Sequence, residues 1–354
     1  MNTNAIKQQA RSLGFDVCGI APAAALPELQ YLPEWLARGY AGEMVYLHKS
    51  AERRADIRNF LPSAHSVVVT GTLYNTDESG VGSRETGVGS DQLAVARYAR
   101  GDDYHVVLQE RLYALLDWMR GQHHDPFEAE IFVDKHHLQE RVYARHAGIG
   151  WIGKNSCVIN PELGSYLFLG GIAVSLALEP DAPSADQCGS CTQCLDACPT
   201  GALVDPHVLD ATRCISYLTI EVPDSIPEAR RPWIGSHAYG CDICQEVCPW
   251  NLAAPRTADG AWRAVARDGV GASQLWERSD DELHQWVKGS AMTYVQLSRF
   301  RRNLAIVIGN SGDPLLLPVL DRPGHGVNNA ARSAQTPVVT EAVAWARARL
   351  TSDA

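Results

Sequence analysis

Eight of the ten cysteines in this 354-residue chain lie between positions 188 and 248, and their spacing constrains the fold more than any other feature. The first run is C-x2-C-x2-C-x3-C-P, from Cys188 to Pro199, and the second is C-x2-C-x3-C-P, from Cys241 to Pro249. Cys214 stands upstream, in the place of the missing first cysteine of the second run. In such paired runs the last cysteine of each run ligates the cluster of the other. The spacing therefore predicts two [4Fe–4S] clusters.

This exchange of the last cysteine predicts the ligands of each cluster, in the manner of bacterial two-cluster ferredoxins. One cluster is expected on Cys188, Cys191, Cys194 and Cys248, and the other on Cys198, Cys214, Cys241 and Cys244. Zinc sites favour paired C-x2-C knuckles, and disulfides need an oxidising compartment, so both alternatives fit less well. Cys18 and Cys157 lie outside the pattern and are expected to be small buried apolar side chains.

Composition bounds the remaining functions. Apolar residues make up 45% of the chain, yet no apolar run reaches the roughly 20 residues of a membrane helix. The first residues show no secretory signal, so we expect a cytoplasmic protein without a membrane partner. The net charge of −10, from 31 basic and 41 acidic residues, excludes a surface that coats nucleic acid broadly.

The order of sequence patterns predicts an α+β multidomain protein. We expect an α/β domain at 1–180, a ferredoxin-like two-cluster domain at 181–260, and an all-α, HEAT-like helical domain at 275–354. Predicted strands of the first domain are Val17–Ile20, Ser66–Thr72, Glu130–Val133 and Leu167–Leu178, and its predicted helices are Ala5–Leu13, Glu34–Tyr46, Tyr104–Met119 and Leu138–Ala147. Residues 79–90, Gly or Ser at seven of twelve positions, predict a surface loop, either a tolerated insertion or a lid. The C-terminal helices are expected at Asp280–Lys288, Val295–Ile308, Leu315–Leu320 and Val338–Leu350.

Three segments resemble the epoxyqueuosine reductase family: VDKHHLQERVYARHAGIGWIGKNSCVIN (Val133–Asn160), ARYARGDDYH (Ala96–His105) and YGCDICQEVCPWN (Tyr239–Asn251). The resemblance extends over nearly the whole chain. It implies reduction of epoxyqueuosine to queuosine at the wobble position of tRNA. It also implies two [4Fe–4S] clusters, a base-off cobalamin beside the nearer cluster, and an external low-potential electron donor. The expected partner is the anticodon stem-loop of a queuosine-family tRNA, bound by a monomer.

The same resemblance makes Asp134 the proton donor. Opening an epoxide leaves an alkoxide-like oxygen that a positioned acid protonates. Because Asp134 directly follows the apolar run Ile131–Val133, burial at a strand end is expected to raise its pKa. The residue position alone equally fits an Asp that caps the helix beginning near Leu138.

The resemblance also predicts the residues that bind cobalamin. They are Arg58, Arg97, Tyr98, Asp134, Gly153, Lys154, Asn155, Ser156, Ser216 and Asp242. Within the GWIGKNS segment the glycines permit close backbone approach to a ligand, although without the resemblance the segment favours a simple β-hairpin turn. Ser216 and Asp242 follow cluster cysteines and are expected between cluster and corrin.

The chain departs from the family pattern at several positions that bear on its substrate. Lys135–His137 places three potentially cationic groups beside Asp134, which would lower its pKa. Gly171 replaces a usual Glu, Thr293–Tyr294 replaces a basic pair, and Glu221–Asp224 lacks a usual basic residue. These changes keep open a cobalamin and iron–sulfur reductase of another small epoxide or halogenated compound. A non-catalytic electron carrier is a third reading.

The distribution of charge leaves room for a local tRNA contact. Residues 283–354 carry a net charge of +4 and residues 1–282 a net charge of −14. Arg299, Arg301 and Arg302 stand together on one predicted helix and are the predicted phosphate contacts. The alternative is a solvated helix face. If the arginines do contact the tRNA, few phosphates are neutralised and the salt dependence of binding is expected to be shallow.

Overall fold

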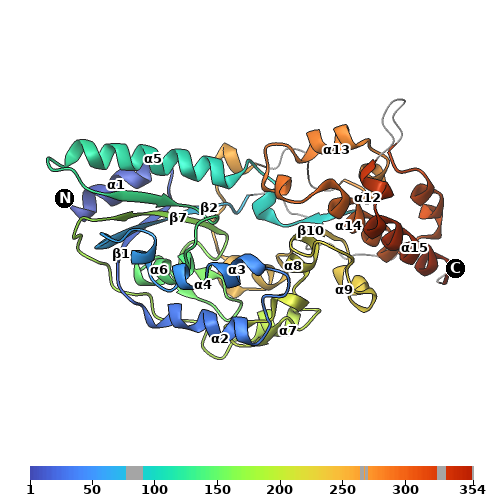
Figure 1. Cartoon of the computed structure of the whole chain (residues 1–354), viewed down its shortest axis with the longest axis horizontal. Coiled ribbons are helices and arrows are strands. Elements are labelled where there is room, and N and C mark those ends of the chain that lie inside the picture. The colour runs from blue at the N-terminus through green and yellow to red at the C-terminus, as the bar shows by residue number, and fades with distance from the viewer. Residues whose placement is uncertain (77–90, 264–266, 268–269, 325–331, 353–354) are drawn as a thin grey trace.

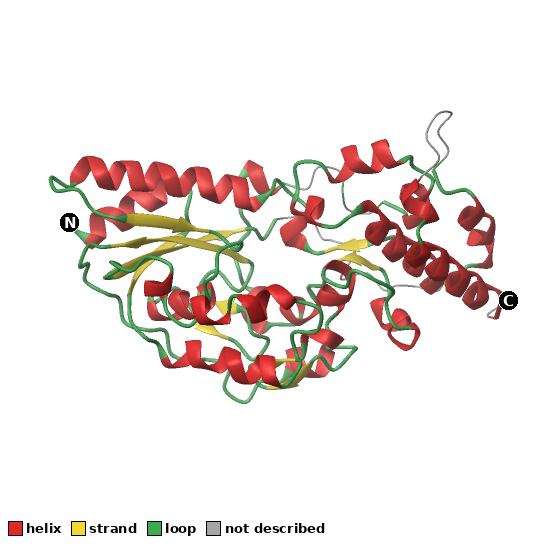
Figure 2. Cartoon of the chain, viewed as in Figure 1, coloured by secondary structure: helices red, strands yellow, loops and turns green. Residues whose placement is uncertain are grey.

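The computed structural model describes residues 1–76, 91–263, 267, 270–324 and 332–352 (Figure 1). The Gly- and Ser-rich loop predicted at 79–90 lies outside these residues. The main sheet lies toward the N-terminal end of the elongated molecule, and the C-terminal end is helical (Figure 2). Within the described ranges, no helix combines the length and the apolar character needed to cross a membrane.

A four-stranded sheet forms the centre of the N-terminal part. Its strands, in spatial order, are β1 (Val17–Pro22), β2 (Ser66–Leu73), β7 (Leu167–Val174) and β4 (Ala129–Phe132). All four predicted strands are present, but every neighbouring pair is antiparallel, whereas alternating strands and helices are typical of parallel sheets. The connection from β1 to β2 leaves and returns at the same end of the sheet, so these two strands run in opposite directions.

Helices cover both faces of this sheet (Figure 1). On one face, α1 (Thr3–Ser12) and α5 (Tyr104–Gln122) pack their apolar side chains against Val68 and Ile172. On the other, α6 (Glu140–His146) and the segment from β1 to β2 pack against Val67, Val69 and Ala173. The helices of that segment are α2 (Tyr31–Ala37), α3 (Val45–Lys49) and α4 (Ala51–Arg54).

Glycine decides two local departures from expectation. The single helix predicted over Glu34–Tyr46 is broken between α2 and α3, where Gly39 and Gly42 adopt φ of +73° and +55°. A Cβ on Gly42 would lie 2.2 Å from the Tyr217 hydroxyl, so this turn is packed against the cysteine-rich segment. In β7, a Cβ on Gly171 would lie 2.3 Å from the Val68 carbonyl oxygen, so this backbone has no room for a larger side chain there.

The cysteine-rich segment is built from short elements joined by turns. Before it comes a hairpin of β5 (Trp151–Ile152) and β6 (Val158–Ile159). Its own elements are α7 (Gln193–Ala197), β8 (Leu203–Asp205), β9 (Val208–Leu209), α8 (Ile215–Ile220), α9 (Arg231–Ile234), β10 (His237–Tyr239), α10 (Ile243–Glu246) and α11 (Pro249–Leu252). Such short elements leave the backbone free to turn around a cluster.

The C-terminal part is helical, as predicted. It contains α12 (Ala272–Trp276), α13 (Asp280–Val287), α14 (Leu297–Asn310) and α15 (Pro337–Ser352). The 3-10 helices of the chain include η1 (Pro27–Gln30), η2 (Ile57–Asn59), η4 (Arg97–Ala99), η5 (Ala211–Arg213), η6 (Glu228–Arg230), η7 (Gly260–Trp262), η8 (Ala291–Tyr294), η9 (Pro314–Asp321) and η10 (Arg332–Gln335). The predicted helix at Leu315–Leu320 thus belongs to a 3-10 helix.

One apolar core crosses the predicted domain boundaries. It joins the buried side chains of α14 and α15 to those of α8 and β10. It also includes β3 (Ala94–Val95), which pairs in parallel with β10. The cysteine-rich segment therefore packs against both the N-terminal part and the C-terminal helices. The domain boundaries expected at 180 and 260 stay predictions.

Candidate active site

The four cysteines predicted for the first cluster line one cavity of about 240 Å³, together with Lys154, Asn155 and Trp250. The indole of Trp151 donates a hydrogen bond to Cys188 Sγ at 3.4 Å and packs edge-on against Trp250. Burial, together with the nearby thiols of Cys188 and Cys248, raises the pKa of Cys194 to about 11. Cys248, which comes from the far end of the segment, thus joins the first run as the spacing predicts.

The second predicted set also comes together. Burial raises the pKa of Cys241, and the thiols of Cys214 and Cys198 add to that rise because they lie close to it. The pKa of Cys244 is also raised, first by its hydrogen bond with Cys157 and by burial, and further by the nearby thiols of Cys241 and Cys214. Among the described residues, no three His, Cys, Asp or Glu side chains are placed to share a single metal ion.

The two cysteines outside the pattern differ. Cys18 belongs to β1, and its side chain is buried in the apolar core that packs against the sheet, as predicted. Cys157 corrects the prediction: it is only half-buried, and its thiol hydrogen-bonds with Cys244. The cause is local, because the side chain of Asn155 accepts a hydrogen bond from the Cys157 amide at 3.1 Å and fixes the turn beside the second set.

The GWIGKNS segment forms the turn of the β5–β6 hairpin, the simpler of its two interpretations. Lys154 Nζ donates to the carbonyl oxygens of Gly189 and Cys191 at 2.7 and 2.9 Å, and Asn155 donates to that of Cys244 at 3.2 Å. A Cβ on Gly153 would lie 2.4 Å from Ile159 Cδ1, so this glycine serves close packing within the hairpin. The turn holds both cysteine loops in place.

Asp134 lies just beyond β4 with a φ of +47°, a left-handed conformation that is uncommon outside glycine. Its Oδ2 accepts hydrogen bonds from the Tyr104 hydroxyl at 2.6 Å and from His105 Nε2 at 3.2 Å. Its backbone amide donates to Glu140 Oε1 at 2.6 Å. The following helix begins at Glu140 after an N-cap, Gln139, without a side-chain cap. Asp134 therefore does not cap this helix.

The environment of Asp134 lowers its pKa, so the rise expected from burial is outweighed, as it would be by nearby cations. Burial raises this pKa, but the hydrogen bonds from His105 and Tyr104 outweigh burial. The positively charged neighbour that lowers the pKa most is therefore His105, the last residue of the ARYARGDDYH motif. The side chains of the Lys135–His137 triplet make other contacts. His136 Nδ1 accepts a hydrogen bond from the Val133 amide at 3.1 Å. Burial lowers the pKa of His137, with Arg54 and Arg53 adding to the effect.

Glu140 is the acidic partner that the residue pattern did not single out. Burial raises its pKa to about 8, and the negative charge of Asp134 adds to that rise. At neutral pH its carboxyl group is therefore largely protonated, while Asp134 is ionised. Two carboxyl groups side by side with pKa values pushed apart are a common arrangement in acid–base sites.

An aromatic wall extends from Asp134 into the protein. It consists of Tyr104, Phe168, Tyr74 and Tyr166. Tyr104 stacks on Phe168 with ring centres 4.6 Å apart, Tyr74 lies 4.2 Å from Phe168, and Tyr166 meets Tyr74 edge-on. The guanidinium of Arg97 lies 4.7 Å above the Tyr166 ring.

The far end of the aromatic wall reaches the second cysteine set. The Arg97 amide donates to Asp242 Oδ2 at 2.6 Å, and Asp242 directly follows Cys241. The Tyr166 hydroxyl and Arg97 Nε are buried and have no hydrogen-bond partner among the residues the structure describes. Unpartnered buried donors are costly, and a polar ligand would satisfy them.

Of the other predicted cofactor residues, Tyr98 contacts the aromatic wall, Ser216 and Ser156 lie near the cysteine sets, and Arg58 does neither. Tyr98 packs edge-on against Tyr104 beside Asp134. The amide of Ser216 donates to the Cys214 thiol. Ser156 adopts a φ of +65° in the hairpin turn. Arg58 stands apart: its guanidinium is half exposed and pairs with Asp56 at 2.5 Å.

Residues missed by sequence reasoning surround Asp134. Tyr46, Glu221 and Tyr294 come from three distant segments: Glu221 hydrogen-bonds with both tyrosines, and the charge of Asp134 acts on all three. Tyr104 and His105 lie in the quoted ARYARGDDYH motif, so their motif was visible although their role was not. Glu221 and Tyr294 lie in segments noted from the sequence only for their missing basic residues, and all three residues converge on Asp134 only in the fold.

Arg301 and Arg302 are not surface phosphate contacts, which corrects the prediction. Both side chains are fully buried. Arg301 donates to the carbonyl oxygens of Trp276 and Arg278 and pairs with Asp280 at 3.1 Å. Arg299 alone of the three keeps part of its surface exposed. The apolar core on both sides of α14 explains this outcome, because the helix is buried around most of its circumference.

Arg302 is expected to be structural, and its replacement tests this. It donates to the carbonyl oxygens of Leu218, Val222 and Asp224, and burial lowers its pKa to about 9. We expect Arg302→Met to lower the free energy of unfolding by about 3–5 kcal/mol, because buried carbonyls lose their donors. Urea denaturation measures this effect. The control Arg322→Met removes a half-exposed guanidinium and should change stability by under ~0.5 kcal/mol. Unchanged stability with weaker tRNA binding in Arg302→Met would restore the phosphate role.

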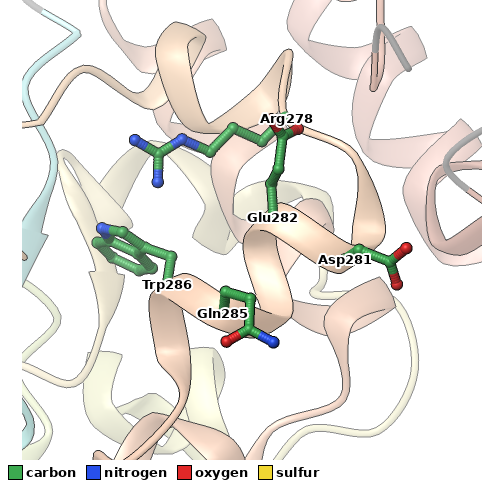
Figure 3. Close-up of a pocket in the computed structure, with 5 residues that line it drawn as sticks. All are labelled: Arg278, Asp281, Glu282, Gln285 and Trp286. Carbon is green, nitrogen blue, oxygen red and sulfur yellow. The ribbon is translucent and has the colours of Figure 1, made fainter. Parts of the chain in front are cut away.

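A second hollow, of about 530 Å³, opens on the C-terminal helices (Figure 3). It is lined by Arg278, Asp281, Glu282, Gln285 and Trp286. All five belong to α13 or the turn before it, and none is a predicted site residue. The acid–base cluster at Asp134, the aromatic wall and the cysteine sets therefore mark the candidate site.

Comparison with family models matches two stretches of the chain. Residues 187–251 match a family described as "4Fe-4S double cluster binding domain". Residues 54–135 match one described as "Epoxyqueuosine reductase QueG, DUF1730". The first match covers all eight predicted ligands, so the chain carries a segment for two [4Fe–4S] clusters.

Curated relatives cover nearly the whole chain. The epoxyqueuosine reductase of Gloeobacter violaceus is 43% identical over 328 residues, which are 88% of this chain and 97% of the relative. That of Escherichia coli is 36% identical over 349 residues, covering 97% of this chain and 88% of the relative.

Solved structures agree with these relatives. A crystal structure of epoxyqueuosine reductase with a tRNA-Tyr epoxyqueuosine-modified stem loop superimposes with a TM-score of 0.87 at 30% identity, covering 98% of this chain and 89% of that one. A structure of the Bacillus subtilis enzyme, with its aspartate catalytic loop swung out of the active site, gives a TM-score of 0.84 at 29% identity, covering 98% of this chain and 90% of that one. Sequence and structure together show that this chain is an oxidoreductase of the epoxyqueuosine reductase family.

Proposed function

We propose that this chain reduces epoxyqueuosine to queuosine at the wobble position of cytoplasmic tRNA, acting as a monomer. One observation carries the proposal. The carboxylate of Asp134 is held at one end of the aromatic wall, and the other end of the wall reaches the second cysteine set through Arg97 and Asp242. A proton-transfer group and an electron-transfer group thus face a common wall, as a reductive epoxide opening requires.

The electron path is expected to run along the cysteine-rich segment. An external low-potential donor would deliver single electrons to the cluster on the exposed Cys188 side and then to the cluster beside Asp242. Cobalamin, when bound, supplies a low-valent cobalt that transfers electrons to the substrate. Arg97 and Tyr166 fit such a group, because they present unpartnered buried donors beside an aromatic surface. Tyr98, Gly153–Ser156, Ser216 and Asp242 complete the set proposed to hold it, and Arg58, which pairs with Asp56, lies outside this set.

Asp134 is proposed to protonate the substrate oxygen as the epoxide carbon–oxygen bond breaks. Protein groups surround Asp134 closely enough for desolvation to act on its pKa, yet 59% of its side-chain surface stays exposed, so it is accessible to a bound substrate. The Tyr104 hydroxyl and the contact between the Asp134 amide and Glu140 keep the carboxylate turned into the site. The swung-out catalytic loop of the Bacillus subtilis relative supports the idea that these contacts hold a movable loop.

The tRNA stem-loop is proposed to dock on the HEAT-like C-terminal helices and to reach Asp134 past Tyr294. Tyr294 and Tyr46 are 58% and 43% exposed, and both lie beside Asp134. Proteins hold unpaired RNA bases by stacking them on such aromatic rings. With Arg301 and Arg302 buried, stacking replaces part of the expected basic contact. The relative crystallised with a modified stem loop supports this class of partner.

Removal of Tyr294 should weaken this contact without changing the chemistry. We expect Tyr294→Ala to raise KM for the stem-loop by roughly 5- to 100-fold, since stacking on a base contributes about 1–3 kcal/mol. The turnover number should change by less than about twofold. Steady-state kinetics on a modified stem-loop measure both. Tyr113→Ala, which removes an exposed tyrosine on α5, is the control, and an equal KM in both variants would contradict the docking surface.

A second candidate is a cobalamin and iron–sulfur reductase of another small epoxide or halogenated compound. Thr293–Tyr294 and the burial of Arg301 and Arg302 favour it, because they reduce the positive charge available for tRNA.

The tRNA-modifying function predicts that reconstituted protein shows a corrinoid absorption band and converts the epoxyqueuosine stem-loop faster than the free nucleoside. Absence of the band would contradict both candidates, and equal rates on the two substrates would favour the second.

A further inference from the structure

We propose that His105, held by Asp103, stores the proton that Asp134 passes to the substrate, so that the three side chains form a proton relay. This inference rests on the proposed function, since it needs a substrate oxygen to protonate. It adds His105 to the site as a positioning residue that acts through Asp134. The proton would move from His105 Nε2 to Asp134 Oδ2 and from there to the oxygen of the opening epoxide.

The geometry of the three side chains is that of an imidazole between two carboxylates. His105 Nδ1 lies 2.7 Å from Asp103 Oδ1, and Nε2 lies 3.2 Å from Asp134 Oδ2. Ionised carboxylates only accept hydrogen bonds, so both ring nitrogens must carry a proton for both contacts to form. The arrangement therefore favours the doubly protonated, positively charged ring.

The ring is fixed in this position by its neighbours. Asp103 is the N-cap of α5 and accepts a hydrogen bond from the His105 amide at 3.1 Å, while its own amide donates to the Gly289 carbonyl oxygen at 2.8 Å. The His105 ring stacks on Tyr104 with centres 4.1 Å apart. The side chain of His105 is 17% exposed against 59% for Asp134, so the stored proton lies behind the group that meets the substrate.

The charges around the relay place the proton on the histidine. Burial lowers the pKa of His105, but the hydrogen bonds to Asp103 and Asp134 outweigh burial and raise it above its ordinary value. The same contacts lower the pKa values of Asp134 and Asp103. The titratable and charged groups that face the relay come from several elements. They are Asp103 and Tyr104 at the start of α5, Asp134 and Lys135 after β4, Glu140 and Arg141 of α6, Tyr46 of α3, Arg54 of α4, Tyr98 of η4, Glu221 after α8 and Tyr294 of η8. An Asp134 that is ionised at rest must receive its proton, and His105 is in contact with it.

The stoichiometry of the reaction supports a proton store. Conversion of an epoxide to an alkene breaks two carbon–oxygen bonds, takes up two electrons and two protons, and releases water. The external one-electron donor supplies the electrons in two steps. Asp134 carries one proton at a time, so it must be reloaded within each turnover. The His105 ring supplies one proton and recovers it from solvent while its Nδ1–H stays on Asp103.

Two substitutions separate this role from a structural one. His105→Gln keeps a side chain that donates a hydrogen bond but cannot hold a proton. Asp103→Asn keeps a good N-cap residue but removes the negative charge of the carboxylate that faces His105 Nδ1. His124→Gln, at an exposed position after α5, is the matched control. Iron content of each purified variant verifies that the clusters and the fold are retained.

The relay predicts the pH dependence of turnover on the stem-loop. In the wild type the turnover number should fall as pH rises through the pKa of His105, above about 6.5. His105→Gln should lower the turnover number by roughly 10- to 100-fold and leave KM within about twofold. The fall of turnover with rising pH, the alkaline limb of the pH profile, should be absent from this variant. Asp103→Asn should move the limb down by about one pH unit. A wild-type profile in His105→Gln, a loss confined to KM, or an unmoved limb in Asp103→Asn would overturn the relay.

A titration without turnover keeps this test apart from that of the proposed function. In protein labelled with 13C-histidine, the signal missing from His105→Gln should titrate above about 6.5 and shift down in Asp103→Asn but not in His124→Gln. If the wild type makes no queuosine while this titration holds, the proposed function fails. If the wild type makes queuosine and the signal titrates below about 6.5, the relay fails.

Discussion

Asp134→Asn is expected to lower the turnover number on the epoxyqueuosine stem-loop by roughly 10²- to 10⁴-fold, the usual contribution of a positioned acid. The amide has nearly the shape of the carboxylate and can still accept a hydrogen bond from Tyr104, but it cannot deliver a proton. KM for the stem-loop and the iron content should therefore stay within about twofold of the wild type. Single-turnover kinetics with pre-reduced protein measure the chemical step directly.

The control for this prediction makes the same chemical change elsewhere. Asp117→Asn alters a carboxylate on α5 whose side chain is 75% exposed, and it should leave all three quantities unchanged. Turnover of Asp134→Asn at the rate of Asp117→Asn would show that another group supplies the proton. A loss of iron in Asp134→Asn would show instead that the residue has a structural role.

Cys248→Ala is expected to remove the first cluster. Cys248 is the ligand that the second run contributes to the cavity of Cys188, Cys191 and Cys194. Without it the cluster lacks one thiolate, and iron should fall from about eight to about four atoms per chain. Turnover should fall on the order of 100-fold or more, because electrons then lack their first carrier. Iron analysis and the cluster absorption bands provide the measurement.

Cys18→Ala is the matched control, because Cys18 is also buried but packs in the apolar core of the sheet. It should keep full iron content and lose only about 1 kcal/mol of stability from the small cavity. Equal iron in the two variants would contradict the exchange of the last cysteine between runs. Loss of both clusters from Cys248→Ala would show that the two sets fold as one unit.

The regular part of the fold was accessible from the sequence because its signals are local. The helix predicted over Tyr104–Met119 is present as α5, and apolar side chains that recur three or four residues apart along it are buried: Leu108, Leu112, Leu115, Leu116 and Met119. The four sheet strands were visible as short β-rich runs. Their antiparallel order was not, because it depends on which end of the sheet each connection returns to, and strand residues do not encode that.

The candidate site was predictable to different depths. The cysteines follow a spacing rule, so their grouping could be derived. Asp134 depended on resemblance. The sequence attributed a lowering of its pKa to Lys135–His137, whereas in the fold the lowering comes from His105, 29 residues away along the chain, and from Tyr104. Arg301 and Arg302 were misplaced because a triplet of arginines reads as surface, whereas α14 is packed on nearly all sides.

The central claim is tested most directly by nucleoside analysis of tRNA from a strain that lacks its own epoxyqueuosine reductase. The account predicts that this chain converts accumulated epoxyqueuosine to queuosine, and that Asp134→Asn, expressed at the same level, leaves epoxyqueuosine in place. Epoxyqueuosine that persists when the wild-type chain is expressed with intact clusters would contradict the account.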